Sequence, residues 1–356
     1  MRKLPVVFLA LPLALLPSPP IPASPAGNPP GDLLREGIQL YDQGDFEGAE
    51  SLFLRVLATD PRNPLAHYEL ALTLLAAERY EECVAMARRG EKLSQNLAGP
   101  MIALAGNCLD LDGKGAKAVK LYRQGLRRYG EHYSLRFNLA VALNGQGDSA
   151  RARENFEETL KLRPNYASAA LHLGTLSEED GLRVPALLAY LRFFTLEPYS
   201  RRSSGAAASV YQLLHLGVRR ESDQKVTVTV DSSSLKKRRR ERLGSVEILL
   251  ALLSAGRFLE ENADKSEAEK TVELLDPFLG AIDAVSERDR PKDRFLWEAL
   301  MPFFRDLKER RLLEPLGYTM LASIEVDGAQ EWLNAQPSAV LELEGWMEAN
   351  GAWLGR

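Results

Sequence analysis

The chain has 356 residues and a formal net charge of -4, from 45 lysine and arginine residues against 49 aspartate and glutamate residues. This balance gives no reason to expect a nucleic-acid-binding protein, which would carry an excess of positive charge. Apolar residues make up 45% of the chain, as in an ordinary soluble protein, and the length is sufficient for two domains.

The first 26 residues are predicted to be a secretory signal peptide. Arg2 and Lys3 form a charged start, and the apolar run over residues 4–16 is too short to span a bilayer. Small residues at 24–26 offer a cleavage site after Ala26. The alternative is a proline-rich tail. We therefore expect an exported protein, either periplasmic or secreted.

Residues 133–166 have the pattern of two helices joined by a turn. Apolar residues fall at helical spacing in each half, at Leu135, Leu139 and Leu143 and again at Phe156 and Leu160. Gly147 suits a turn that needs a positive φ, and Pro164 ends the second helix because it has no N–H group. The stretch is therefore predicted to be one helix–turn–helix unit.

The same pattern recurs on both sides of this unit and resembles the tetratricopeptide repeat. The matching residues of the unit are Leu139-Ala140, Leu143, Gly147-Asp148, Ala152, Phe156 and Pro164. The other copies cover residues 30–63, 64–97, 99–132 and 167–200. The bulky aromatic residue that the family carries near the start of each repeat is missing. The resemblance covers about half of the chain and implies an all-α fold, a right-handed α-solenoid over residues 30–200.

In this family the first helix of each repeat lines a concave groove that holds an extended peptide or a partner helix. The resemblance places the following residues on that groove: Leu34, Ile38, Tyr41, Tyr68, Leu72, Asn107, Asp110, Phe137, Asn138, Val141, Asn144, Leu171, His172 and Thr175. Aromatic and amide side chains suit recognition of a peptide backbone together with apolar side chains. The alternative for several of them is a consensus role, since asparagine is common in the family where Asn138 stands.

One variant of the family binds the C-terminal carboxylate of its partner with two asparagines and several basic residues. Asn107 and Asn138 match the asparagines. Ala103 and Ser168 stand in place of lysines, however, and His172 stands in place of an arginine. The resemblance therefore implies a protein or peptide partner but not a carboxylate clamp.

The two cysteines of the chain, Cys83 and Cys108, fall on repeat helices at small or apolar sites. They are interpreted either as buried thiols that pack as small apolar groups or as a disulfide between neighbouring repeats in an oxidising compartment. A bridge between helices needs a narrow Cβ geometry, which favours the thiols.

Residues 201–235 are predicted to be a capping helix followed by an extended connector. The helix, over residues 201–220, would cover the apolar side of the last repeat. Residues 225–230, KVTVTV, alternate as in a strand, but no partner strand is evident. An extended linker is therefore favoured over pairing with another chain.

Residues 236–356 are predicted to be a helical C-terminal domain without the repeat period, and no family is recognised in them. The basic run at 236–242 is interpreted as the solvated start of a helix, with contact to an anionic membrane as the alternative. Four tryptophans lie in this half and favour core packing over a pocket: Trp297, Trp332, Trp346 and Trp353.

The sequence shows no catalytic, metal or cofactor signature. The four histidines are scattered, and no Gly-x-Ser-x-Gly turn occurs. The leading hypothesis is an exported, non-catalytic scaffold that binds a protein or peptide, with no cofactor and no nucleic acid. The alternatives are an enzyme with its active site in residues 245–356 and, more weakly, a peripheral membrane protein attached through residues 236–242.

Overall fold

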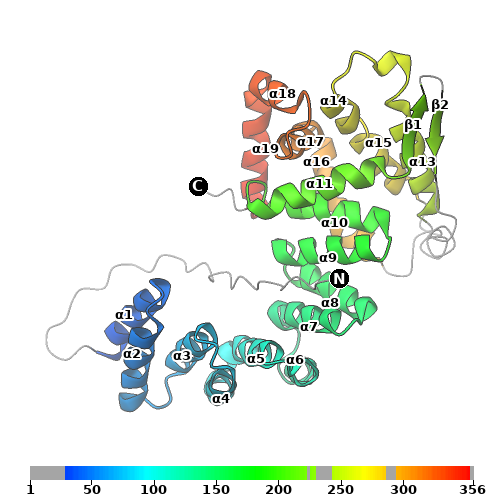
Figure 1. Cartoon of the computed structure of the whole chain (residues 1–356). Helices are drawn as coiled ribbons and strands as arrows, with labels where there is room; N and C mark the ends of the chain where they lie inside the picture. Colours follow the sequence, from blue (N-terminus) through cyan, green and yellow to red (C-terminus); the bar gives the residue numbers. More distant parts are fainter. Residues whose placement is uncertain (1–28, 223–224, 230–242, 286–293, 353–356) are drawn as a thin grey trace.

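The computed structural model describes residues 29–222, 225–229, 243–285 and 294–352 (Figure 1). The predicted signal peptide, the basic run at 236–242 and Trp353 lie outside the described residues. The described residues are mostly helical, so the all-α prediction is confirmed.

Residues 30–196 form five successive helix pairs. Their bounds are α1 (Pro30–Asp42) with α2 (Phe46–Thr59), α3 (Pro64–Ala76) with α4 (Tyr80–Gly90), α5 (Gln95–Leu111) with α6 (Gly115–Tyr129), α7 (Tyr133–Gly145) with α8 (Ser149–Leu162), and α9 (Ala167–Glu179) with α10 (Arg183–Leu196). Helix α5 begins ahead of Gly99, where the third repeat was predicted to start, and contains Pro100 within it.

The turn inside each pair uses a left-handed backbone conformation. Gly44, Gly113, Gly147 and Gly181 have φ values of 82°, 72°, 81° and 71°, which glycine adopts without a steric penalty. In the second pair Glu78 stands there with a φ of 58°, a conformation that costs a non-glycine residue about 1 kcal/mol. The shared turn gives the pairs their common geometry.

Small residues let the two helices of a pair approach closely. A Cβ atom on Gly106 would lie 2.1 Å from the ring of Tyr122, and one on Gly174 would lie 2.7 Å from the ring of Tyr190. In the fourth pair Ala140 and the ring of Phe156 are both fully buried. The second helix of each of these pairs thus places an aromatic ring against a small residue of the first.

The pairs follow one another along a bent path (Figure 1). The first helices α1, α3, α5 and α7 contact one another in succession, whereas the second helices of neighbouring pairs contact each other less. The first helices therefore lie on the inner side of the bend and the second helices on the outer side. We call the solvent-facing side of α1, α3, α5, α7 and α9 the inner face.

A disulfide joins Cys83 of α4 to Cys108 of α5, so the favoured interpretation as two thiols is wrong. Helices α4 and α5 pack directly against each other. This brings the two Cα atoms to 6.5 Å, within the range that a disulfide spans. Both cysteines are fully buried.

The predicted capping helix is present as α11 (Arg201–His215) but ends five residues earlier than predicted, and the predicted extended linker is wrong. Strands β1 (Val218–Ser222) and β2 (Lys225–Val228) form an antiparallel two-stranded sheet in which Val218 pairs with Val228. Gly217 makes the turn from α11 into the sheet with a φ of 81°, and a Cβ atom there would lie 2.3 Å from the carbonyl oxygen of Thr229. Only glycine fits this place without a shift of the backbone.

The C-terminal half continues as short helices. They are α13 (Gly244–Gly256), η1 (Glu260–Asn262), α14 (Glu267–Val272), α15 (Leu275–Asp283), η3 (Leu296–Leu300), α16 (Met301–Glu309), α17 (Leu313–Ala322), α18 (Ala329–Ala335) and α19 (Pro337–Ala349). The single helix predicted over residues 267–285 is divided into α14 and α15.

The two halves share one continuous hydrophobic core. Every residue of α10 except Pro185 is buried, because α9, α11, α13 and η3 all pack against it. His215 of α11 is hydrogen-bonded to Ser254 of α13 at 2.8 Å and to Thr271 of α14 at 3.0 Å. Burial lowers the pKa of His215 to about 3, so this histidine joins the three helices in its neutral form.

The tryptophans pack in this core. Trp297 and Trp346 are buried, and the indole N–H of Trp346 donates a hydrogen bond to Asp306 at 2.6 Å. The ring of Trp332 stacks on Tyr318 with centroids 4.3 Å apart. The described tryptophans therefore fill space between helices.

Candidate partner-binding surface of the repeats

The residues predicted to line the groove fall into two groups in the structure. Most are partly or fully exposed on first helices: Ile38, Tyr41, Tyr68, Leu72, Asn107, Asp110, Asn138, Val141, Asn144, Leu171 and Thr175. Leu34 and Phe137 are instead buried, and His172 is partly exposed with its ring 5.6 Å from that of Phe137.

Phe137 and His172 belong to an aromatic cluster between the fourth and fifth pairs. The ring of His172 stacks on Phe156 at 5.3 Å and meets Phe137 edge-on at 5.6 Å. Phe137 also contacts Tyr166 at 5.0 Å. Burial, aided by Arg202, lowers the pKa of His172 to about 4. Phe137 is buried among these rings and does not line the groove, whereas His172 stays partly exposed on α9 beside Leu171.

The prediction that Leu34 lines the groove is also wrong. Leu34 is a buried residue of α1 and belongs to the hydrophobic core. The same helix presents Ile38 and Tyr41 at partial exposure. The inner face of α1 therefore begins one turn later than predicted.

Tyrosines from several first helices lie near one another on the inner face. Burial raises the pKa of Tyr68 to about 12, and the electrostatic influence of Glu69, Tyr133 and Tyr41 adds to the shift. Helices α1, α3 and α7 therefore place their tyrosines within electrostatic reach. Tyr133 was not predicted, although it opens the repeat that includes Phe137.

Arg163 fixes the tyrosines at the junction of the fourth and fifth pairs. Its guanidinium group donates a hydrogen bond to the Tyr133 hydroxyl at 2.6 Å and lies 4.7 Å from the centroid of that ring. It also lies 5.6 Å from the centroid of Tyr166. This cation–π contact holds both rings in place.

Two carboxyl groups accompany the tyrosines of the first two pairs. The pKa of Glu69 is raised to about 7, chiefly by burial and further by Asp42. Its side chain makes no ion pair with a described residue. The ionised form of Glu69 is therefore poorly stabilised in the folded chain.

Two of the three asparagines on the inner face, Asn107 and Asn138, differ in the use of their side chains. The side-chain oxygen of Asn107 accepts a hydrogen bond from the Tyr122 hydroxyl at 2.8 Å, so half of its amide is already used. Asn138 is partly exposed, and its side chain makes no hydrogen bond with another described residue. Asn138 therefore retains both its donors and its acceptor for a ligand.

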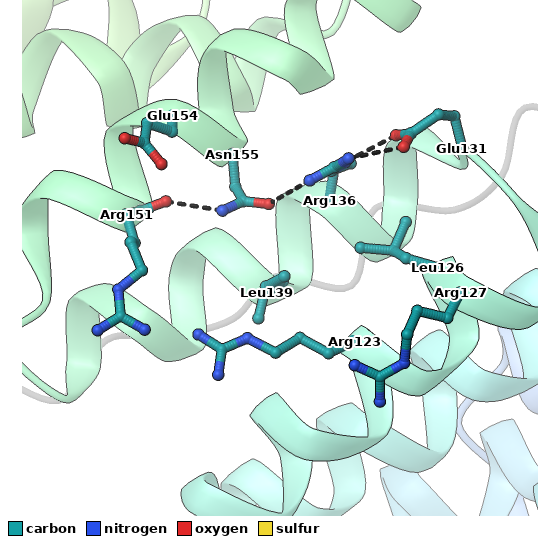
Figure 2. A pocket seen from close by; sticks show the side chains of 9 residues that line it. All are labelled: Arg123, Leu126, Arg127, Glu131, Arg136, Leu139, Arg151, Glu154 and Asn155. Atoms are coloured by element: carbon teal, nitrogen blue, oxygen red, sulfur yellow. Dashed lines mark hydrogen bonds and ion pairs between the residues drawn. The ribbon is translucent and has the colours of Figure 1, made fainter.

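A concave site, which the sequence analysis missed, lies between the third and fourth pairs and is lined mainly by their second helices (Figure 2). We call it the outer cleft. Its volume is about 330 Å³, and its lining comes from α6, α7, α8 and the segment before α7: Arg123, Leu126, Arg127, Glu131, Arg136, Leu139, Arg151, Glu154 and Asn155. Its arginines come from three helices, so no single helical face in the sequence indicates it.

The described residues contain no cluster of three or more histidine, cysteine, aspartate or glutamate side chains placed to hold a metal ion. A search of the same residues found no helix long and apolar enough to cross a membrane.

Comparison with known proteins identifies the repeated segments. A family model described as tetratricopeptide repeat matches residues 34–90, 112–167 and 145–192. Cellulose synthase operon protein C of Xanthomonas axonopodis pv. citri is 25% identical over 341 residues, which cover 94% of this chain and 18% of that protein. The chain thus spans about a fifth of the length of this curated relative.

Solved structures of other proteins match about half of this chain. The pilF protein of Pseudomonas aeruginosa is 20% identical and matches 52% of this chain and 82% of its own, with a TM-score of 0.45. The protein TTC0263 of Thermus thermophilus is 18% identical and matches 51% of this chain and 99% of its own, with a TM-score of 0.43.

Proposed function

The repeat region of this chain consists of tetratricopeptide repeats, and from this premise we propose that the protein is a non-catalytic scaffold that holds an extended segment of another protein on its inner face. Proteins built from such repeats bind protein or peptide partners. The observation that carries the proposal is the set of partly exposed aromatic, amide and apolar side chains on successive first helices, among them Tyr41, Tyr68, Asn138 and Val141.

The chemistry of this face suits an extended backbone. Asn138 can donate to a peptide carbonyl and accept from a peptide N–H at the same time. Val141 and Leu171 offer apolar area to side chains on either side of such a contact, and the tyrosines add rigid rings with a polar tip. Binding of this kind is an equilibrium and changes no covalent bond.

The packing of the C-terminal half supports a non-catalytic role. The alternative of an enzyme places an active site near Trp297 and Trp332. Trp297 is buried, and Trp332 stacks on Tyr318. The rings thus occupy the space that a substrate pocket around them would need.

Export to the periplasm or the medium is part of the proposal. The disulfide between Cys83 and Cys108 supports it, because such bonds persist mainly in oxidising compartments. Cell fractionation tests this point: recovery of the protein in the cytoplasm with reduced thiols would count against export.

Site-specific photocrosslinking tests the inner face. A photoreactive phenylalanine analogue replaces Asn138 in one variant and Leu54 in another. Leu54 is the matched control, since it is 47% exposed on α2, a second helix. We expect a partner adduct from Asn138 and none from Leu54, because an extended partner would contact first helices only.

A second pair of variants checks that the adduct reports binding. Val141→Lys places a charge beside Asn138 and should abolish the adduct, whereas Leu54→Lys should leave it unchanged. Adducts that form from Leu54 alone, or that survive Val141→Lys, would place the partner elsewhere on the molecule.

A further inference from the structure

The outer cleft is rich in arginine. Four arginines and two glutamates line it, which leaves a net charge of two positive units. In Figure 2, Arg123 and Arg127 extend from α6, and Arg151 and Glu154 extend from α8. The cleft thus brings guanidinium groups from two neighbouring repeats to one concave site.

Some of these charges are already neutralised within the chain. Arg136 forms a two-pronged ion pair with Glu131, at 2.6 and 2.7 Å, and donates to the side-chain oxygen of Asn155 at 3.1 Å. Arg151 pairs with Asp148, the residue that caps the start of α8, at 2.8 Å. These pairs hold the wall of the cleft in a fixed arrangement.

Arg123 and Arg127 differ from the other two arginines. Neither forms an ion pair or a side-chain hydrogen bond with any residue that the structure describes. They stand four residues apart on α6 and hence on the same side of that helix. Two guanidinium groups at the mouth of a cleft, without an internal carboxylate, are suited to a carboxylate that comes from outside.

We propose that the outer cleft binds an acidic segment of a partner polypeptide, with Arg123 and Arg127 donating to its carboxylates. Leu126 and Leu139 supply apolar lining for the aliphatic part of an aspartate or glutamate side chain. The proposal is independent of the inner face, because the outer cleft is formed largely by second helices. Both surfaces can therefore be occupied at once.

The two glutamates of the cleft favour a polypeptide over a denser polyanion. Glu154 is exposed on α8, and Glu131 stands at the other side of the site. A nucleic acid or a polyphosphate carries a negative charge on every unit, so the carboxylates of Glu131 and Glu154 would repel it. An acidic peptide can pair one or two carboxylates with Arg123 and Arg127 and place a neutral or basic residue beside Glu154.

Fluorescence anisotropy with a labelled hexaglutamate peptide tests the proposal on the full chain at low ionic strength. Arg123→Gln combined with Arg127→Gln removes the two donors without introducing repulsion. Arg55→Gln combined with Arg62→Gln is the matched control, since both are exposed on or just after α2 and the net charge changes equally. We expect the cleft variant to weaken binding by about tenfold or more and the control to change it little.

Three results would overturn the proposal. The first is equal weakening in the cleft variant and the control, which would indicate general attraction by surface charge. The second is tighter binding of labelled tripolyphosphate or single-stranded DNA than of hexaglutamate, at equal salt. The third is the absence of hexaglutamate binding by the wild-type chain. Circular dichroism of each variant confirms that the fold is kept.

Discussion

Glu69 is a carboxyl group whose ionisation the fold opposes, and it shows how a single residue couples the inner face to pH. Burial, helped by Asp42, raises its pKa from 4.5 to about 7. At pH values between these two, the Glu69 carboxyl group is protonated in the folded chain and ionised in the unfolded chain. The contribution of Glu69 to the free energy of unfolding is therefore fully present at low pH and is lost as the pH rises toward 7.

Glu69→Gln should remove this dependence. The variant keeps the shape of the side chain but cannot ionise, so at pH 8 its free energy of unfolding should exceed that of the wild type by on the order of 2 kcal/mol. Urea unfolding at a series of pH values from about 4.5 to 8 measures the difference. The exposed residue Glu47 supplies the control, and parallel curves for wild type and Glu69→Gln would contradict the assignment.

Side-chain direction could be predicted from the sequence only to within about one helical position. Tyr41, Asn138 and Val141 lie partly exposed on first helices, where the repeat pattern puts them. Phe137 lies inward because Phe156 and Tyr166 enclose it. A helical period specifies the face of a helix, but contacts with the next repeat decide which side chains that repeat covers.

At the scale of elements, the disulfide between α4 and α5 is a covalent cross-link within the helical array. It joins residues separated by 25 in the sequence, and closing a loop of that size contributes about 3 kcal/mol in the chain-entropy description. This cross-link joins the second helix pair to the third. It should therefore stabilise the N-terminal part of the array most.

Reduction with dithiothreitol should lower the midpoint of urea unfolding of the wild-type chain. Cys83→Ala combined with Cys108→Ala should show the lowered midpoint from the start and no further response to dithiothreitol. A wild-type midpoint that is insensitive to reduction, with free thiols verified by alkylation, would show that packing alone holds α4 against α5.

Some elements could be predicted from a local sequence pattern, and others could not. The apolar spacing and the turn glycines predicted the paired helices, and the structure contains these helices. Strand β1 has the sequence VRRES, which does not alternate, so β2 had no visible partner. The outer cleft was equally hidden, since Arg123, Arg136 and Arg151 are brought together only when α6, α7 and α8 pack.

At the scale of the whole molecule, α10 belongs to both halves. Nearly all its residues are buried, and Arg183 at its start donates hydrogen bonds to the carbonyl oxygens of Leu213 and Leu214 at 2.7 and 3.1 Å. Arg192 lies 3.8 Å from the ring centroid of Phe303 in α16. The C-terminal half therefore stabilises the last repeat in the way that a capping repeat stabilises other arrays.

A chain that ends after Ser200 should aggregate or unfold at a lower temperature, because it exposes the apolar residues of α10 to water. A chain that begins at Pro64 loses the first pair but keeps α10 covered, so it should not aggregate and should lose less stability. Gel filtration and thermal unfolding compare the two. Equal behaviour of both truncated chains would mean that the C-terminal half folds apart from the repeats.

The burial of α10 also constrains how such a protein can change its length over evolution. Duplication or loss of one helix pair at the amino-terminal end alters a single interface and leaves the remainder intact. The same event next to α10 would separate it from α11, α13 and η3 at once. Descendants of this chain should therefore differ in the number of units before the fifth pair, while the junction itself stays unchanged.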